Sequence, residues 1–253
     1  ASESPDNLWF QIKHGNMDVD DSDIYGKSKV KYTNYQLGYD RKVGPNDYVG
    51  GFLSSTTGSV GFHGLTADGT VDIRNAYGAG LYGTHILPNH QYIDAMLQTG
   101  TMDSKYADTS WSTKNFGMMI GYGATIEATK NLKVNPYVHL SYDRIRTDDA
   151  VFSSGNTVSA DTQNNIALKL GVNLRSASGL YGGAAYSRGL SGDYSAYVNG
   201  VAMPSSDNKA NVMYLSLGYR GNIGPNSILD ISAEKTFMDY TGWNLAGRVN
   251  FLF

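Results

Sequence analysis

The chain has 253 residues, with 20 Lys and Arg against 23 Asp and Glu, a formal net charge of −3 and no cysteine. A near-neutral charge without a basic stripe argues against nucleic-acid binding, and the lack of cysteine excludes a disulfide scaffold and any thiolate metal site. No apolar run reaches the ~18 residues of a transmembrane helix, and single all-β barrels routinely have this length.

Apolar and polar residues alternate with a period of two along most of the chain. In segment 166–175, for example, apolar Ile166, Leu168 and Leu170 alternate with smaller or polar neighbours. Glycine recurs every few residues, and in a helix interior it costs about 1 kcal/mol relative to alanine. The pattern therefore predicts β-strands, each with one apolar face and one polar or small face.

Twelve such segments follow one another, and most exceed the ~9–11 residues that a tilted strand needs to cross a bilayer. In chain order they are 8–17, 29–43, 48–57, 70–87, 91–104, 113–128, 132–146, 165–175, 179–192, 210–223, 227–238 and 243–253.

The connections nearly alternate in length. Tight connections with turn residues lie at 44–46, 88–90, 130–131, 177–178 and 224–226. Long polar connections lie at 18–28, 58–69, 105–112, 147–164 and 193–209, and the last connection, 239–242, is short where a long one is expected. Short turns at one end and long loops at the other are typical of outer-membrane barrels. We therefore predict an all-β fold, a transmembrane 12-stranded antiparallel up-and-down β-barrel with both termini periplasmic.

A large soluble β-sandwich or propeller is the alternative fold. Its strands average only ~5–6 residues, about half the length of the segments here. Tyrosines lie toward segment ends, as expected for the two interfacial aromatic girdles of a membrane barrel. Pro136 is the exception within the pattern, because proline removes a donor from the hydrogen-bond ladder.

Motifs for catalysis or cofactor binding are weak. Gly78–Gly83 matches the dinucleotide fingerprint as a string, but it lies inside an alternating segment with no helix after it. The five histidines form no chelating pattern, and no G-x-S-x-G elbow occurs. We predict no catalytic, cofactor-binding or metal-binding residues, no cofactor and no enzymatic activity, although a Ser-His or Asp-His site at the barrel rim stays open as an alternative.

Charged residues on the small or polar face form a subtler signal. Buried in a dry barrel, each would cost several kcal/mol unless paired. Twelve strands should instead leave a narrow wet passage, because eight give a filled interior and sixteen an open channel. The charges could line a conduit for an extended chain or a helix, or could pair across the lumen and stiffen the barrel. The predicted lumen-lining residues are Asp40, Asp94, Glu127, Asp143, Lys169, Arg175, Arg220, Asp230, Glu234 and Arg248.

The end of the chain carries the most specific pattern. Apolar residues and Gly247 alternate from Leu245 to the final Phe253. An aromatic last residue preceded by alternating apolar positions resembles the signal that the bacterial barrel-insertion machinery reads. An ordinary closing strand that pairs with the first strand is the simpler interpretation.

In series, YQLGYDRKVGPNDYVGGFLSSTTG, AYGAGLYGTHILPNHQYIDAMLQTG and GWNLAGRVNFLF resemble the C-terminal translocator domain of bacterial autotransporters (type V secretion) over 8–253. The resemblance implies a monomeric barrel in the bacterial outer membrane, surrounded by lipid and lipopolysaccharide. It implies export of a covalent passenger upstream, through or with the lumen, and assembly by the barrel-insertion (BAM) machinery. By position, the assembly signal would be Gly247, Val249, Phe251 and Phe253.

Residues 1–7 hold no helix and no passenger, and we interpret them as the remnant of a linker or an N-terminal tail, followed by the barrel domain at 8–253. The chain is then either an excised translocator or a stand-alone barrel. Three functions stay open: a passenger translocator, a porin or surface adhesin, and, less favoured, a barrel enzyme.

Overall fold

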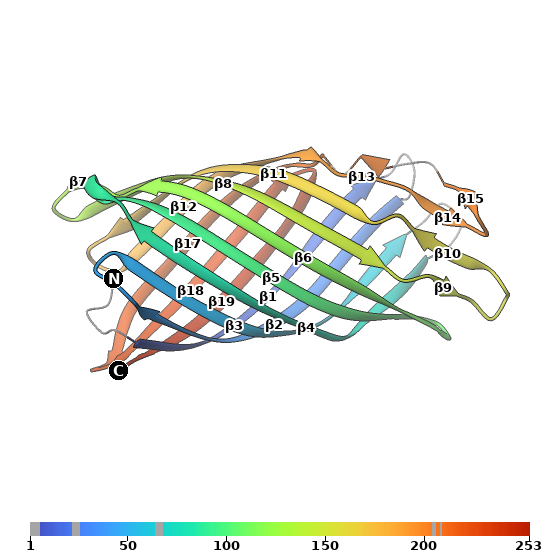
Figure 1. The fold of residues 1–253 in the computed structure, drawn as a ribbon, viewed down its shortest axis with the longest axis horizontal. Helices are drawn as coiled ribbons and strands as arrows, with labels where there is room; N and C mark the ends of the chain where they lie inside the picture. The colour runs from blue at the N-terminus through green and yellow to red at the C-terminus, as the bar shows by residue number, and fades with distance from the viewer. Residues whose placement is uncertain (1–5, 22–25, 64–67, 204–205, 208) are drawn as a thin grey trace.

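In the computed structural model, twelve long antiparallel strands close into one barrel, which confirms the predicted all-β, 12-stranded antiparallel barrel (Figure 1). The structure describes residues 6–21, 26–63, 68–203, 206–207 and 209–253. The twelve strands are β1 (Asp6–Asp21), β2 (Gly26–Lys42), β3 (Asp47–His63), β4 (Asp68–Ile86), β5 (Gln91–Tyr106), β6 (Thr109–Ala124), β8 (Leu132–Thr147), β11 (Gln163–Ser176), β12 (Leu180–Ser191), β17 (Asn211–Gly224), β18 (Ser227–Met238) and β19 (Tyr240–Leu252).

The barrel closes where the first strand meets the last. β1 pairs antiparallel with β19 from Asn7, opposite Leu252, to Val19, opposite Tyr240. We call this pairing the seam. Because the neighbours of every long strand are hydrogen-bonded to it, none of the twelve leaves a free sheet edge. A closed barrel is the one β-architecture that satisfies its backbone in lipid.

Large apolar side chains cover the outside rather than a core. Leu53, Leu81 and Leu217 are each about two-thirds exposed, while the buried hydrophobic residues of the described chain are few. The exposed residues alternate along each strand, as in Leu8, Phe10 and Ile12 of β1. In the described part of the chain no helix is long and apolar enough to cross a membrane, a finding that does not bear on crossing by strands.

Aromatic rings on the inner face lie flat over glycines of the neighbouring strand. Trp9 is directly opposite Gly38, and a Cβ at Gly38 would lie 2.2 Å from the Trp9 ring. Tyr137 covers Gly171 in the same way, at 2.4 Å. These rings shield the glycine backbone and fix the register of the strands. Four more aromatic–glycine pairs follow this rule: Tyr82–Gly50, Phe52–Gly80, Tyr92–Gly123 and Tyr181–Gly218.

The two ends of the barrel differ. The described chain starts and ends at one end, here called the terminal end, where the predicted tight turns also lie (Figure 1). One of them contains the short 3-10 helix η1 (Pro88–His90), in which Asn89 has a φ of 61°. Residues 1–5 of the predicted 1–7 segment lie outside the described residues, while Asp6 and Asn7 already belong to β1.

At the opposite end, called the loop end, three of the predicted long connections are wrong. The ladder continues through most of 18–28 and 58–69, because the residues there pair with the adjacent strand instead of looping out. The expected loop 105–112 is a tight hairpin through Ala107 and Asp108, with Ala107 at a φ of 52°.

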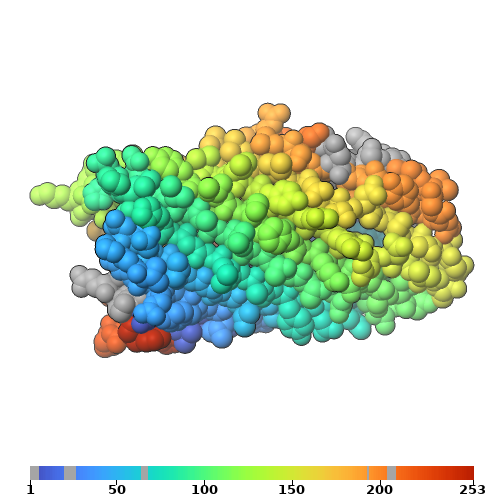
Figure 2. Space-filling model, viewed as in Figure 1, coloured from blue at the N-terminus to red at the C-terminus, as the bar shows by residue number. Residues whose placement is uncertain are grey.

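The two remaining long connections, 147–164 and 193–209, join each other. β10 (Thr157–Ala160) from the first pairs antiparallel with β14 (Ala196–Val198) from the second, and Figure 2 shows the two segments side by side at the loop end. The other short strands there are β9 (Ala150–Val151), β13 (Asp193–Tyr194), β15 (Val201–Ala202) and β16 (Ser206–Asp207). The four-stranded sheet β15-β14-β10-β9 is the loop-end sheet.

Pro136 on β8 lies where the hydrogen-bond ladder between β6 and β8 is interrupted. β6 ends at Ala124, and the chain resumes pairing with β8 only as β7 (Ile126–Thr129). Proline offers no backbone donor, so the ladder opens opposite it. The Asn135 side chain bridges the gap by donating to Thr125 Oγ1 at 2.7 Å.

Candidate functional site

The barrel interior and its terminal end gather most of the charged groups that the sequence singles out. Nine of the ten predicted lumen-lining residues lie on long strands, at positions that alternate with exposed apolar residues. Glu127 lies on the short β7, and its Oε1 is 3.2 Å from Lys133 Nζ on an exposed surface.

One group of four side chains fills the interior beside the seam, and we call it the seam cluster: Trp9, Asp40, Tyr82 and Arg248. The Arg248 guanidinium lies 4.1 Å from the centre of the Trp9 ring and 3.7 Å from Asp40 Oδ2. Trp9 Nε1 donates to Tyr82 Oη at 3.0 Å, and Tyr82 Oη donates to Asp40 Oδ2 at 2.9 Å. The four residues come from β1, β2, β4 and β19, so the cluster ties the last strand to three of the first four strands across the seam.

Every charge in the seam cluster has a partner. Arg248 and Asp40 are only 31% and 23% exposed, and half-buried ions are tolerated when they are paired and hydrogen-bonded. Asn7 Nδ2 also donates to Asp40 at 3.1 Å, while Arg248 Nε donates to Asn250 Oδ1 at 3.0 Å. The seam cluster therefore stiffens this side of the barrel.

Several of the other predicted lumen residues have separate partners. Lys169 Nζ lies 4.0 Å from the centre of the Tyr214 ring, and Asp94 accepts a hydrogen bond from Thr84 Oγ1 at 2.6 Å. Glu234 accepts from Asn244 Nδ2 at 3.2 Å. In addition, Asp230 accepts from Tyr181 Oη, and Asp143 lies beside Gly117.

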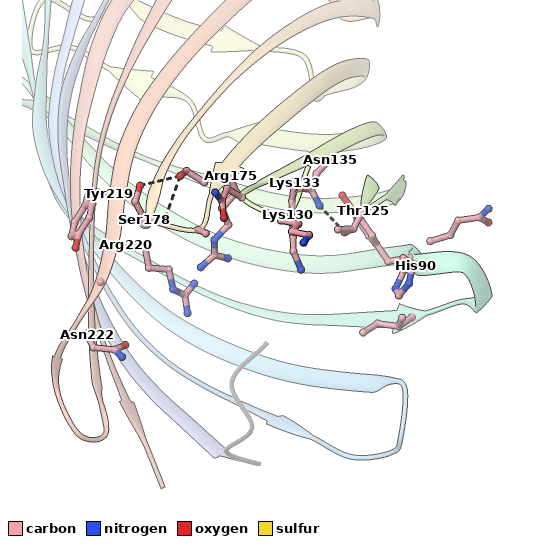
Figure 3. Close-up of a pocket in the computed structure, with 18 residues that line it drawn as sticks. His90, Thr125, Lys130, Lys133, Asn135, Arg175, Ser178, Tyr219, Arg220 and Asn222 are labelled. Atoms are coloured by element: carbon pink, nitrogen blue, oxygen red, sulfur yellow. Dashed lines mark hydrogen bonds between the residues drawn. The ribbon is translucent and has the colours of Figure 1, made fainter. Parts of the chain in front are cut away.

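A second group of charges surrounds an opening of about 780 Å³ at the terminal end (Figure 3). Its basic residues are Lys130, Lys133, Arg175 and Arg220 together with His90, and we call these five residues the basic mouth. They come from the turns and strand ends of β5, β8, β11 and β17, and no Asp or Glu is among the described residues that line the opening. Polar groups of Asn131, Asn135, Ser176, Ser178 and Asn222 also belong to the lining.

The pairing inside the basic mouth is unfavourable. Arg175 on β11 lies directly opposite Lys133 on β8, and like charges in that position destabilise a sheet. Glu127 offsets the charge of Lys133, and Asp230 on β18 lies directly opposite Arg220, but no described carboxylate forms an ion pair with Arg175 or Lys130. The mouth therefore has a surplus of positive charge, although the whole chain has a net charge of −3.

Sequence reasoning predicted Arg175 and Arg220 but missed that they gather with Lys130 and Lys133. The signal was present, because all four residues stand next to connections that the turn chemistry already assigned to one end of the barrel. What was missing was the comparison of charges across separate turns.

The predicted assembly-signal residues lie on the outer face of β19 or just beyond it. Val249 is opposite Phe10 on β1 and Leu229 on β18, while Gly247 is opposite Ile12 and Ile231. Phe251 and Phe253 are about half or more exposed, and the Phe253 ring lies 6.4 Å from that of Tyr39.

The loop-end sheet is held to the barrel by a few contacts. Thr109 Oγ1 donates to the Val151 carbonyl at 3.2 Å, and the Phe152 and Tyr106 rings lie 6.4 Å apart. A hydrogen bond from Ser153 keeps the pKa of Asp108 below its usual value. A hydrogen bond to Asp161 raises the pKa of Tyr197 within the sheet. The sequence predicted the two long connections but not their pairing.

The histidines and carboxylates of the described residues do not gather into a metal-binding group. Within the residues that the structure describes, no three His, Asp or Glu side chains come together as a metal site would require. The two histidine–carboxylate contacts at His63–Asp68 and His85–Asp47 are exposed pairs at strand ends.

Comparison with protein-family models gives a match to the autotransporter beta-domain over residues 8–234, which ends before β19. No curated protein sequence matches.

Among solved structures, the translocator domain of the autotransporter NalP from Neisseria meningitidis is similar, with a TM-score of 0.82, 12% identity and coverage of 100% of this chain and 90% of that chain. The transport unit of AIDA-I from Escherichia coli has a TM-score of 0.73, 15% identity and the same two coverages. The beta domain of Bordetella BrkA has a TM-score of 0.66, 16% identity and coverage of 98% and 100%. At these identities the structural likeness concerns the fold.

Proposed function

The chain belongs to the autotransporter beta-domain family, and from that premise we propose how its barrel carries out export. It is an outer-membrane β-barrel that helps to export a covalently linked N-terminal passenger to the cell surface. The observation that carries this conclusion is the family match over 8–234, on a closed barrel of twelve strands. The match does not favour a stand-alone porin or adhesin.

The terminal end faces the periplasm, and the loop end faces the cell exterior. The support for this orientation is the contrast between tight turns at the terminal end and the loop-end sheet opposite, because outer-membrane barrels have short periplasmic turns and longer extracellular loops. Residues 1–7 are then the end of the linker that leads from the passenger into β1, and 8–253 form the membrane domain.

The ten predicted charged residues line the path of the exported chain. The alternation of charged and exposed apolar positions supports this role, as do the interior contacts of Asp40, Lys169 and Arg248. The barrel has no catalytic role in this proposal, and any activity belongs to the passenger.

The barrel acts as a monomer in a lipid and lipopolysaccharide membrane, and the barrel-insertion machinery assembles it. Support for the monomer comes from the pairing of all twelve long strands within one chain. Gly247, Val249, Phe251 and Phe253 act as the assembly signal, because they present an alternating apolar edge at the end of the closing strand.

Export is tested in a Gram-negative host by fusing a signal peptide and a slowly folding reporter protein upstream of the full chain. We expect protease added to intact cells to remove the reporter while the barrel stays protected. The control fusion lacks residues 240–253, the closing strand. A reporter that stays inside cells whose barrel is folded and heat-modifiable would contradict the proposal.

Assembly is tested with the double substitution Phe251→Ser/Phe253→Ser. We expect most of this variant to stay in the periplasm and to be degraded, because the insertion machinery would no longer find the apolar edge. The matched control, Phe116→Ser, alters another exposed aromatic residue, on β6, and should still assemble. Heat-modifiable mobility and protease resistance measure the outcome, and wild-type amounts of folded double variant would overturn the assignment.

A further inference from the structure

The basic mouth has features of a binding site rather than of a structural contact. Its cations line an opening at the terminal end where the described lining residues include no carboxylate, and the opposed Lys133 and Arg175 cost stability. The seam cluster shows that this chain pairs interior charges closely elsewhere. A surplus of positive charge at one place therefore points to an anionic partner that is not part of the described chain.

The arrangement of the cations indicates the shape of that partner. His90, Lys130, Arg175 and Arg220 come from four different turns or strand ends around the rim, and Figure 3 shows the two arginines on one side of the opening, Lys130 in the middle and His90 on the other side. A single phosphate or carboxylate needs donors that converge on it. An extended polypeptide carries its alternate side chains on one face at a spacing of about 7 Å, so a series of carboxylates can reach separate cations.

We propose that the basic mouth binds an acidic segment of an extended polypeptide, through ion pairs from its Asp and Glu carboxylates to Lys130, Arg175 and Arg220. The inference rests on the proposed function in one respect. The linker of an exported passenger joins β1 at the terminal end, so it lies close to the basic mouth. The mouth then selects for acidic stretches in the polypeptide next to the barrel and holds them at the periplasmic entrance. Lining amides such as Asn131 and Asn222 hydrogen-bond the backbone of the segment.

The proposal predicts a charge-selective peptide interaction. The probe is a dye-labelled twelve-residue peptide of alternating Glu and Ser, with a Lys/Ser peptide of the same length as its counterpart. Binding to the purified full chain in lipid nanodiscs is followed by fluorescence anisotropy. We expect the acidic peptide alone to bind, and the binding to weaken steeply as salt rises, since partly exposed ion pairs are screened.

The variant Lys130→Gln/Arg175→Gln should weaken binding of the acidic peptide by about tenfold, as expected for the loss of two partly exposed ion pairs. The matched control is Arg144→Gln/Arg146→Gln, which removes two cations from the opposite end of β8 and should bind like the wild type. Equal weakening in both variants, or binding of both peptides alike, would overturn the proposal. Displacement of the peptide by inorganic phosphate at constant ionic strength would also overturn it, in favour of a small-anion site.

The export assay separates this inference from the proposed function. If the reporter reaches the surface but the acidic peptide does not bind, the inference fails and the export function stands. If the peptide binds as expected but no reporter is exported, the export function fails while the site for an acidic peptide stands. Export of a reporter with an acidic linker should also slow in the Lys130→Gln/Arg175→Gln variant, relative to the same reporter with a neutral linker.

Discussion

The seam cluster and the basic mouth occupy the same barrel and treat charge in opposite ways. At the seam, Arg248 and Asp40 are half-buried, and each has hydrogen-bond partners within the chain. At the mouth, Arg175 stands opposite Lys133 and has no described carboxylate as a partner. The first arrangement stabilises the barrel, and the second costs stability at a place where an exported chain must pass. The contrast separates charges that are paired within the chain and stabilise the fold, as at the seam, from charges that are free to bind a partner, as at the mouth.

The largest effect is expected from Trp9→Ala in the seam cluster. Trp9 is 4% exposed, its ring supports the Arg248 guanidinium, and its Nε1 donates to Tyr82. Removing a buried Trp costs about 3 kcal/mol or more in unfolding free energy, including the lost cation–π contact. Urea unfolding of the barrel in lipid vesicles, followed by the fluorescence of Trp111 and Trp243, measures the change.

The control for that prediction is Leu8→Ala, the neighbouring residue on the outer face, which is 39% exposed. Because Leu8 already contacts the surrounding medium in the folded barrel, its truncation should cost clearly less than that of Trp9. A loss of unfolding free energy in Leu8→Ala as large as that in Trp9→Ala would show that the seam cluster does not stabilise the barrel more than the outer face does.

A smaller loss is expected from Arg248→Met, because the substitution leaves the Asp40 carboxylate half-buried without its cation. Breaking one side of such a pair costs about 2 kcal/mol, less than for a fully buried pair. The double variant Asp40→Asn/Arg248→Met should recover part of the loss, since no unpaired charge remains. A double-mutant cycle on unfolding free energies tests this coupling, and purely additive losses would contradict it.

Much of the fold could be predicted from the sequence because each strand repeats one simple rule. Lipid outside and water inside require strict alternation, so twelve segments were visible without any knowledge of their partners. The excess of glycine and tyrosine was visible as well, but its cause was not. Glycines such as Gly38 and Gly171 lie under aromatic rings of the next strand, and that pairing depends on a register that one segment does not encode.

The loop-end sheet and the two charge clusters could not be predicted for the same reason. β10 and β14 belong to connections about 40 residues apart in the chain, and only the closed barrel brings them together. Parity placed Asp40 and Arg248 on one face of their strands, but their contact required the closure of β1 on β19. Contacts within a strand follow from local pattern, whereas contacts across strands follow from register and closure.

The smallest effect, and the sharpest test of the contrast, is expected from Arg175→Gln. If Arg175 and Lys133 repel each other across the strands, removing one of these two cations should leave the unfolding free energy unchanged or raise it by a few tenths of a kcal/mol. Lys133→Gln is the matched control, because it removes the opposite cation but also its 3.2 Å ion pair with Glu127, and should therefore gain less. A loss at Arg175 comparable with that at Arg248 would mean that Arg175 has a structural role after all. Both the seam cluster and the basic mouth would then stabilise the barrel, and the positive charge of the mouth would no longer be an argument for an acidic partner.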